Sequence, residues 1–514
     1  MARMSRREFV KAGAKGVALA TIPAIFKLNP LTAFATPAKE NATLSDYYAH
    51  FGVDESLVRQ VMAAGLERGG DYCDIFFEHR INSYVGLLDN AVDRAYSDVD
   101  LGVGIRVIEG DQTGYSFTED LSPKAIKLAA TTASNIAHEG KSVAAVALEF
   151  HPSPDYYPLK TLWEDVGIER KIPYLEKINE KVFSLDKRLV KSEIGFEDEG
   201  WYVLIITSEG RVVYDYRPMV TISVNCIAEE KGRREQGYFS LGPRAGIEYF
   251  TPERIDQLAG QAVRNTIDLF EAVKPEGGEM EIVLASGNSG ILLHEAIGHG
   301  MEADCNRKGI SIYADKIGKP IAESFVSIID DGTLPNYRGS INVDDEANPS
   351  QKTYLVEDGI LKSYMHDRIS AGHYKVKPTG NGRRQSFRFA PLPRMRNTYM
   401  LPGPHTKEEI IQSVKKGLYA ESFTNGAVYI GAGDFTFYVA TGRMIENGRL
   451  TRPVKDINII GNGPEVLRNI VMVGNDLKMY EGGGYCGKDG QHVLISDGLP
   501  TCKVSSITVG GVAS

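Results

Sequence analysis

The sequence predicts an α+β protein with two main parts. An N-terminal α/β domain includes a β-meander, and a strand-rich C-terminal domain carries one helix with two histidines. Helix-like and strand-like periodicities alternate early in the chain, and long alternating strands follow. The last 240 or so residues are rich in glycine and strand patterns. At 514 residues the chain is long enough for about two to four domains at ~150 residues each.

The first folded segments predict a compact α+β unit over about residues 48–140. A helix is expected over 55–68 and another from Pro123, each preceded by an Asp or Ser that can cap it. The run DYCDIFFEHR, 71–80, alternates as a strand. The run LGVGIRVIEGDQTGYSF, 101–117, predicts two strands around a Gly-Asp turn.

A second unit is predicted over about 160–272. Three prolines within 151–159 mark the linker before it. Residues 188–239 predict a β-meander with Glu-Gly turns, and a helix follows over 251–272. The segment KPEGGEM, 274–280, is typical of a domain boundary.

These segments divide the chain into an N-terminal domain, 36–272, and a C-terminal domain, 273–514, with one clear further helix at 406–418. In the C-terminal domain the strand EIVLA and a turn lead into the helix with the two histidines, which Ser289 or Asn288 is expected to cap.

Residues 1–35 predict a twin-arginine export signal rather than part of the fold. Arg6 and Arg7 are followed by Phe9, an apolar stretch and the cleavage pattern Ala33-Phe34-Ala35. The expected location is periplasmic or otherwise exported. The alternatives are an ordinary amphipathic helix or an uncleaved anchor. Gly and Pro residues interrupt the apolar stretch, so no transmembrane domain is expected in the mature chain.

The composition limits the classes of molecule that the chain is expected to bind. The net charge is −9 with 58 basic and 67 acidic residues, which argues against a nucleic-acid partner. The cysteine count of five is odd, so at least one is unpaired within the chain, and buried free thiols are expected for most of them. They are Cys73, Cys226, Cys305, Cys486 and Cys502.

The stretch LLHEAIGHG carries the main chemical signal. His294 and His299 are five positions apart, which places them roughly 140° apart on a straight α-helix. They could bind one metal ion only if the helix ends, kinks or forms a π-bulge between them, and Gly298 is the expected weak point. Glu295 would then stand beside the metal as a base. Structural histidines remain the alternative.

A metal site needs a third protein ligand. Cys486 lies in EGGGYCGKDGQ, where neighbouring glycines leave the sulfur accessible. A glycine-rich turn with an inert cysteine is the alternative. The other histidines and cysteines that could serve are His366, His373, His405, His492, Cys305 and Cys502.

Four separated motifs resemble the TldD/PmbA family of metallopeptidases, and specifically its TldD type. They are HEAIGHGMEADCNRKG, GRRQSFRFAPLPRMRNTYMLPG, VYIGAGDFTFYVATGRM and GYCGKDGQ, and the resemblance covers about residues 48–510. It implies one Zn²⁺ per catalytic subunit, held by His294, His299 and Cys486, with Glu295 as the general base. The implied reaction is hydrolysis of peptide bonds in short or unfolded peptides.

The resemblance also implies a dimer with a homologous TldE/PmbA-type subunit, or alternatively with itself. Family members are generally cytoplasmic, so the export signal is a departure. Two other functions stay open: a non-catalytic binding or assembly subunit, and a zinc hydrolase of non-peptide amides.

Further polar residues are candidates for stabilising an oxyanion. They are His366, His373, Arg383 and Arg384. The two arginines are expected more simply to be surface or subunit-contact charges. Asp344, Asp345 and Glu346 are expected to form a solvated turn.

Overall fold

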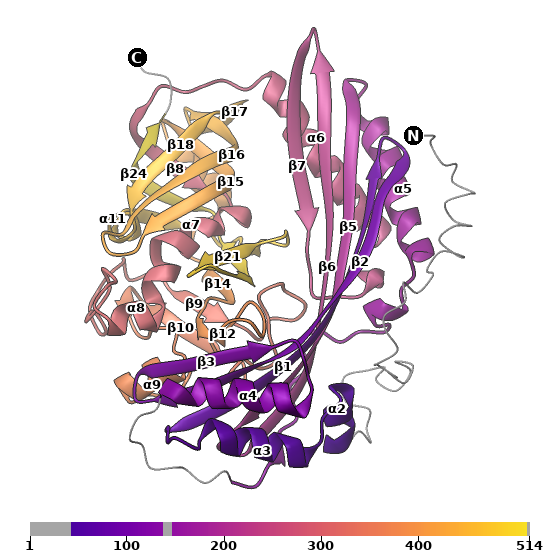
Figure 1. Ribbon diagram of the computed structural model, residues 1–514. Helices are drawn as coiled ribbons and strands as arrows, with labels where there is room; N and C mark the ends of the chain where they lie inside the picture. The colour runs from indigo at the N-terminus through magenta and orange to yellow at the C-terminus, as the bar shows by residue number, and fades with distance from the viewer. Residues whose placement is uncertain (1–42, 137–145, 511–514) are drawn as a thin grey trace.

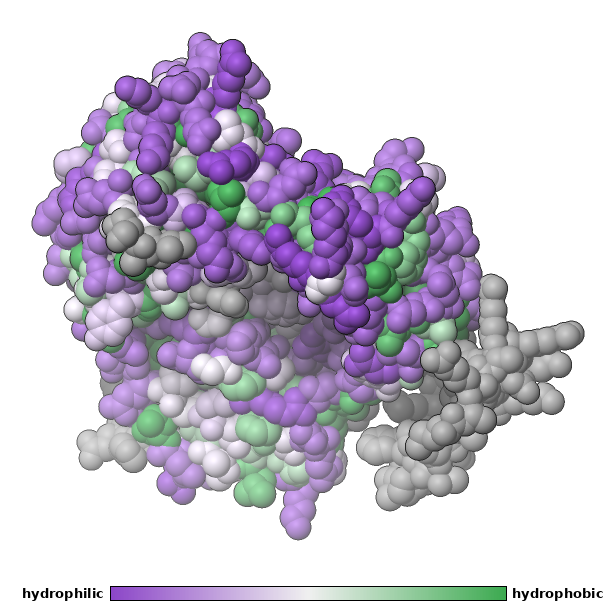
Figure 2. All heavy atoms as spheres, turned by 90° about the horizontal axis from the view of Figure 1, so that it is seen from above, coloured by the Kyte–Doolittle hydropathy of each residue, from purple (hydrophilic) through white to green (hydrophobic). Residues whose placement is uncertain are grey.

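The computed structural model describes residues 43–136 and 146–510. The predicted signal peptide, 1–35, lies outside these described residues. Within them, no helix combines the length and apolar character needed to cross a membrane. The α+β class predicted from the sequence is confirmed, and hydrophilic residues cover most of the face seen in Figure 2.

A seven-stranded sheet organises the N-terminal domain, in the order β3-β2-β1-β5-β6-β4 with β7 also paired to β6. All of its pairs are antiparallel except β4–β6. The long strands span the molecule in Figure 1. The strands are β1 (Tyr72–Leu88), β2 (Ala91–Glu109), β3 (Gln112–Thr118), β4 (Glu149–Phe150), β5 (Leu189–Thr207), β6 (Arg211–Glu230) and β7 (Arg233–Leu241).

Helices cover this sheet at both ends, as Figure 1 shows. Those at one end are α2 (Leu44–His50), α3 (Glu55–Gly65) and α4 (Pro123–Ala133), and those at the other are α5 (Ile168–Leu185) and α6 (Pro252–Ile267). Asp54 caps α3 and Ser122 caps α4, as their sequences predict. Each group of helices has its own hydrophobic core on the sheet.

The predicted β-meander is confirmed as β5, β6 and β7. Strands from both predicted units, 48–140 and 160–272, belong to one sheet because β1 pairs with β5 along fifteen residue pairs from Asp74↔Thr207 to Leu88↔Glu193. The proposed boundaries between the units and domains stay a prediction.

Two further sheets build the C-terminal domain, in the orders β15-β8-β24-β18-β16-β17 with β19 on β24, and β11-β10-β9-β14-β23-β20. The first contains β8 (Gly278–Leu284), β15 (Lys416–Tyr429), β16 (Asp434–Glu446), β17 (Arg449–Pro453), β18 (Ile457–Asn462), β19 (Ile470–Val473) and β24 (Cys502–Gly510). The second contains β9 (Ile328–Asp331), β10 (Lys352–Glu357), β11 (Ile360–Leu361), β14 (Asn397–Met400), β20 (Lys478–Met479) and β23 (Ser496–Leu499).

Two small hairpins complete the domain, β12 (Gly382–Arg383) with β13 (Leu392–Pro393), and β21 (Tyr485–Lys488) with β22 (Gln491–Leu494). Its helices are α7 (Ile291–Leu293), α8 (Ala303–Arg307), α9 (Arg368–Tyr374), α10 (Lys407–Gln412) and α11 (Gly463–Arg468).

The predicted helix at 406–418 is too long. A capping box between Thr406 and Glu409 starts α10, but β15 already begins at Lys416. Gly417 pairs there with Glu281 of β8, and a Cβ at Gly417 would lie 2.5 Å from the Glu281 carbonyl oxygen. Pairing with a distant strand therefore ends the helix early.

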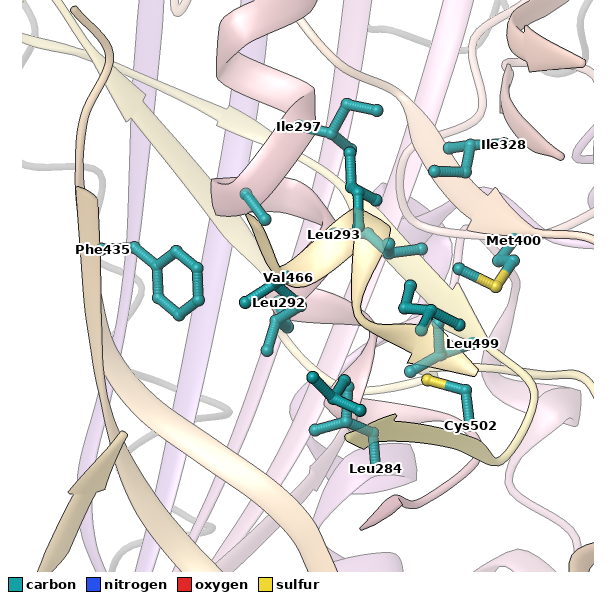
Figure 3. Close-up of a cluster of buried hydrophobic side chains, with 14 of the residues drawn as sticks. Leu284, Leu292, Leu293, Ile297, Ile328, Met400, Phe435, Val466, Leu499 and Cys502 are labelled. Carbon is teal, nitrogen blue, oxygen red and sulfur yellow. The ribbon is translucent and has the colours of Figure 1, made fainter. Parts of the chain in front are cut away.

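The hydrophobic core of the C-terminal domain anchors the segment with the two histidines. Leu292, Leu293 and Ile297 are buried and point into a cluster with Leu284 and Leu499 (Figure 3). Burying one such side chain stabilises the fold by roughly 1.5–3 kcal/mol, so the segment is held rigidly on its apolar face. Its opposite face is free to carry polar groups.

Candidate metal centre

The chain leaves α-helical geometry at the two histidines, as the spacing predicts. α7 is followed by a π-helical turn, His294–Gly298, and the backbone N–H of His299 donates to the carbonyl of His294. This i to i+5 bond widens the turn, so residues five apart return to one face. The Tyr313 hydroxyl donates to the Ala296 carbonyl at 3.0 Å, which satisfies a backbone group within the widened turn.

Gly298 has a packing reason to be glycine at the end of this turn. A Cβ there would lie 2.1 Å from the sulfur of buried Met395. The expected cap at Ser289 or Asn288 is wrong: Asn288–Gly290 is itself a 3₁₀ turn, and the Ser289 hydroxyl donates backwards to the Ala285 carbonyl. The strand-to-helix connection is too tight for a side-chain cap.

The tertiary structure brings His294, His299 and Cys486 together. One potential ligand atom from each lies within 4.8 Å of the others, and all three residues are buried. The Cys486 sulfur lies 3.6 Å from Nε2 of His299, and the two imidazole rings are nearly perpendicular at 87°. Cys486 is placed by β21, which pairs with β22.

Two carboxylates orient the imidazoles. Asp497 lies 3.2 Å from Nδ1 of His294, and Glu302 lies 3.0 Å from Nδ1 of His299. A carboxylate favours a proton on the nitrogen that faces it, so Nε2 is the nitrogen of each ring that can release its proton and bind a metal. Glu302 is held in turn by Lys488, 3.2 Å away.

Sequence reasoning missed both carboxylates. Glu302 follows His299 by three positions, a spacing that could have singled it out on a helix. Asp497 has no local signal, because it lies 203 positions from its partner.

The charged groups around Cys486 favour the thiolate form of its side chain. Burial raises the pKa of the Cys486 thiol, but the two imidazoles outweigh burial and bring the pKa well below its ordinary value. Burial likewise opposes protonation of His299, yet Cys486 and Glu302 raise its pKa to about 10. The pKa of Glu302 falls to about 2 because Lys488 and His299 overcome its burial. The cluster is therefore a set of mutually stabilised charges.

A cavity of about 560 Å³ opens in front of these residues. Glu295 lines it together with the three potential ligands. Burial raises the pKa of Glu295, while the two histidines work against that shift. Residues 426–428 at the end of β15 form another wall of this cavity. A buried carboxyl group thus faces the same space as the two imidazoles and the thiol.

Other sequence candidates do not line this cavity. His366 is buried and its pKa falls to about 4 through burial, and His373 lines a separate groove. Cys305 is also buried, and burial raises its pKa to about 11. All five cysteines are buried and free, as expected.

The interpretation of Arg383 and Arg384 as surface charges is wrong. Their exposed fractions are 5% and 1%. Asp344, Asp345 and Glu346 are also buried instead of forming a solvated turn. Their partners come from distant strands: Asp345 pairs with Arg217 at 2.6 Å, and Glu346 with Arg106 at 2.7 Å.

Three protein-family models together match most of the chain. The PmbA/TldA metallopeptidase C-terminal domain matches residues 277–511, the central domain matches 162–270, and domain 1 matches 73–137. The metalloprotease TldD homolog of Buchnera aphidicola (subspecies Schizaphis graminum) is 38% identical, covering 86% of this chain and 93% of its own length. The zinc metalloprotease TldD homolog of Saccharolobus solfataricus is 31% identical, covering 87% of this chain and 98% of its own.

Solved structures share the fold. A Thermotoga maritima protein described as a modulator of a DNA gyrase has a TM-score of 0.72 at 22% identity, covering 89% of this chain and 100% of its own. TldE from Thermococcus kodakarensis has a TM-score of 0.70 at 17% identity, covering 88% of this chain and 100% of its own.

Proposed function

We propose, from the premise that this chain belongs to the PmbA/TldA metallopeptidase family, that it is a zinc-dependent peptidase acting on short or unfolded peptides. The observation that carries the proposal is the convergence of His294, His299 and Cys486 in a cavity that Glu295 also lines. The family is the one that the motifs predict, which supports the proposal independently of the geometry.

The donor set fits Zn²⁺. Two imidazoles and one thiolate leave one position of a tetrahedral site open, as catalytic zinc sites require. Zinc bond lengths predict a sulfur-to-nitrogen separation of about 3.6 Å in a tetrahedral site, and Cys486 and His299 show 3.6 Å. Zinc at these residues would supply a Lewis acid that polarises a carbonyl group and acidifies a water molecule. The relative named as a zinc metalloprotease supports this metal.

Glu295 is proposed as the general base. Its carboxylate lines the cavity, and burial raises its pKa toward the range where a carboxyl group can both accept and return a proton. It would accept the proton of the attacking water and later deliver it to the leaving amine nitrogen. Asp497 and Glu302 would keep the imidazoles oriented throughout.

We also propose a mode of assembly and a cellular location. The fold shared with a TldE structure supports a dimer with a homologous TldE/PmbA-type subunit or with itself. Export to the periplasm through the twin-arginine signal is proposed from the sequence of residues 1–35. Cell fractionation of the native chain and of an Arg6→Lys/Arg7→Lys variant tests it, and unchanged export of the variant would contradict it.

The decisive experiment measures casein hydrolysis and bound zinc in Glu295→Gln, with the exposed Glu408→Gln as the matched control. We expect the Glu295 variant to lose hydrolysis by about 10²–10⁴-fold while keeping its zinc, and the control to match the native chain. Hydrolysis at the native rate in Glu295→Gln would refute the assigned mechanism. A native chain without bound metal or peptidase activity would favour a non-catalytic binding subunit. Cleavage of amide compounds but not of peptides would favour the non-peptide hydrolase.

A further inference from the structure

A second cavity, of about 100 Å³, lies beside the candidate metal centre. It is enclosed between strands of the N-terminal sheet and the β12 and β21–β22 segments of the C-terminal domain. Five arginines line it, together with the single carboxylate Asp345. They are Arg80, Arg217, Arg244, Arg383 and Arg384.

Three of these arginines have carboxylate partners. Arg80 pairs with Glu199 at 2.6 Å, and Arg384 lies 3.3 Å from Asp74. Arg217 pairs with two carboxylates, at 2.6 Å and 2.9 Å.

The other two have no ion pair among the described residues. Arg244 donates to the carbonyls of Arg338 and Pro218, and Arg383 donates to those of Met395 and Leu494. Two buried guanidinium groups thus line one cavity without a direct ion pair among the described residues, and the one carboxylate of the cavity, Asp345, is already paired with Arg217.

Unused hydrogen-bond donors line the same cavity. Nε1 of Trp201 and Nε of Arg384 are buried without any acceptor among the described residues. Trp201 is 7% exposed and Arg384 is 1% exposed. Nε of Arg80 is in the same situation. Buried donors without acceptors are rare in folded proteins and indicate a missing partner.

The uncompensated charge carries an energetic cost. Burial lowers the pKa of Arg383 to about 9 and that of Arg244 to about 10. Asp345 opposes the shift at Arg383, and Tyr157 and Asp215 oppose it at Arg244, but burial and the neighbouring arginines outweigh them. A buried charge is retained in proteins mainly where it is paired. An anion with several acceptor oxygens would pair both guanidinium groups and accept from the unused donors.

We propose that this cavity binds a small oxyanion through Arg383 and Arg244, with Trp201 and Arg384 as further donors. The chemical class is a carboxylate or a group of similar size and charge, because planar guanidinium groups bind such oxygens in pairs.

The position of the cavity links it to the metal centre. Tyr485 lines both cavities, and the next residue in β21 is Cys486. Because Tyr485 lines both cavities, they are neighbours, and a peptide in the metal cavity could place its terminal carboxylate among the arginines. This source of the oxyanion rests on the proposed function, whereas a free inorganic oxyanion does not.

Isothermal titration with inorganic phosphate tests the site without any hydrolysis. We expect saturable binding at one site per chain, weakened at least tenfold in Arg383→Met and in Arg244→Met. The exposed Arg234→Met, whose side chain is 71% exposed, serves as the matched control and should bind like the native chain. Trp201→Phe removes one donor and keeps an aromatic ring at this position, so it should weaken binding severalfold even if an arginine variant fails to fold.

A pair of peptides distinguishes the two sources. In zinc-loaded Glu295→Gln, a hexapeptide with a free C-terminal carboxylate and its C-terminal amide are compared. Tighter binding of the acid by at least tenfold, lost in Arg383→Met, would identify the peptide carboxylate. Equal binding of the two peptides together with saturable phosphate binding would identify a free oxyanion. If neither phosphate nor the acid binds in an Arg383-dependent way, the proposal is overturned, whether or not casein is hydrolysed.

Discussion

The metal centre and the arginine cavity are neighbours, yet they differ in whether their buried charged groups have a partner of opposite charge. At the metal centre each imidazole faces a carboxylate, and Glu302 faces Lys488 as well. In the arginine cavity, Arg244 and Arg383 have no direct ion pair among the described residues and donate to backbone carbonyls instead. The first arrangement positions ligands for a cation, and the second leaves room for an anion. Removing a single charged side chain should therefore have different effects on stability and binding at the two sites.

Cys486→Ala should have the largest effect. Zinc binding of about 10–16 kcal/mol spread over four ligands corresponds to about 2.5–4 kcal/mol for each, or roughly a hundredfold to a thousandfold in affinity. We expect at least that loss in a chelator competition assay. Cys305→Ala is the control, since this buried cysteine is outside the ligand group. Native zinc affinity in Cys486→Ala would remove the thiolate from the site.

Two arginines of the same cavity should respond differently to replacement by methionine. Arg217→Met leaves Asp215 and Asp345 unpaired and buried, which should cost about 3–5 kcal/mol in the free energy of unfolding. Arg383→Met removes a charge that has no direct ion pair, together with its hydrogen bonds to two backbone carbonyls, so it should cost less than Arg217→Met, about 1–2 kcal/mol. Denaturant unfolding measures both. Equal destabilisation by the two variants would show that Arg383 is compensated after all.

Glu302→Gln should weaken zinc binding by about 10–100-fold, because it removes the charge that orients His299. The exposed Glu408→Gln is the control, and the same chelator competition assay applies. If Glu302→Gln binds zinc as tightly as the native chain, the charge of Glu302 does not contribute to the metal centre, and the contrast with the arginine cavity is lost.

Gly298→Ala should destabilise the fold by about 1–3 kcal/mol through contact with the Met395 sulfur. Gly372→Ala in α9 is the matched control, since a Cβ there meets nothing within 4 Å. The unfolding midpoints of the two variants measure this difference. In the Gly298→Ala/Met395→Ala double variant the close contact is absent, but the cavity left by the Met395 side chain should still lower the stability. An unperturbed Gly298→Ala would mean that the turn can shift away from Met395.

Zinc affinity should also depend on pH. His299 has a pKa of about 10 in the metal-free protein, so between pH 6 and 9 it is protonated and must release a proton when zinc binds. Affinity should rise by about tenfold per pH unit for each displaced proton across this range, and the pKa of His294 is raised as well by Cys486 and Asp497. Chelator competition across this range measures the slope. Affinity that does not change with pH would show that the imidazoles are neutral before binding.

Local signals in the sequence predicted those features whose cause lies within a few residues. The angle between His294 and His299 on a straight helix required a break, and the structure has a π-turn there. Asp54 and Ser122 mark the starts of α3 and α4 through caps that need only three residues. Cys486 was singled out by its glycine neighbours and by its motif.

Long-range pairing decided what these signals could not. The acidic segment Asp344–Glu346 and the pair Arg383–Arg384 were interpreted as solvated because their partners lie on distant strands. Asp497 was missed for the same reason, and the end of α10 depends on the pairing of Gly417 with Glu281.

The sequence by itself determined the α+β class, the family and the need for an irregular turn at Gly298, because periodicity, motif and helical angle are properties of neighbouring residues. Only the tertiary structure decided that Asp497 orients His294 and that Arg244 and Arg383 remain without an ion pair. Burial and Coulomb interactions depend on distances between atoms, and residues separated by 100 or more positions acquire those distances only in the folded chain.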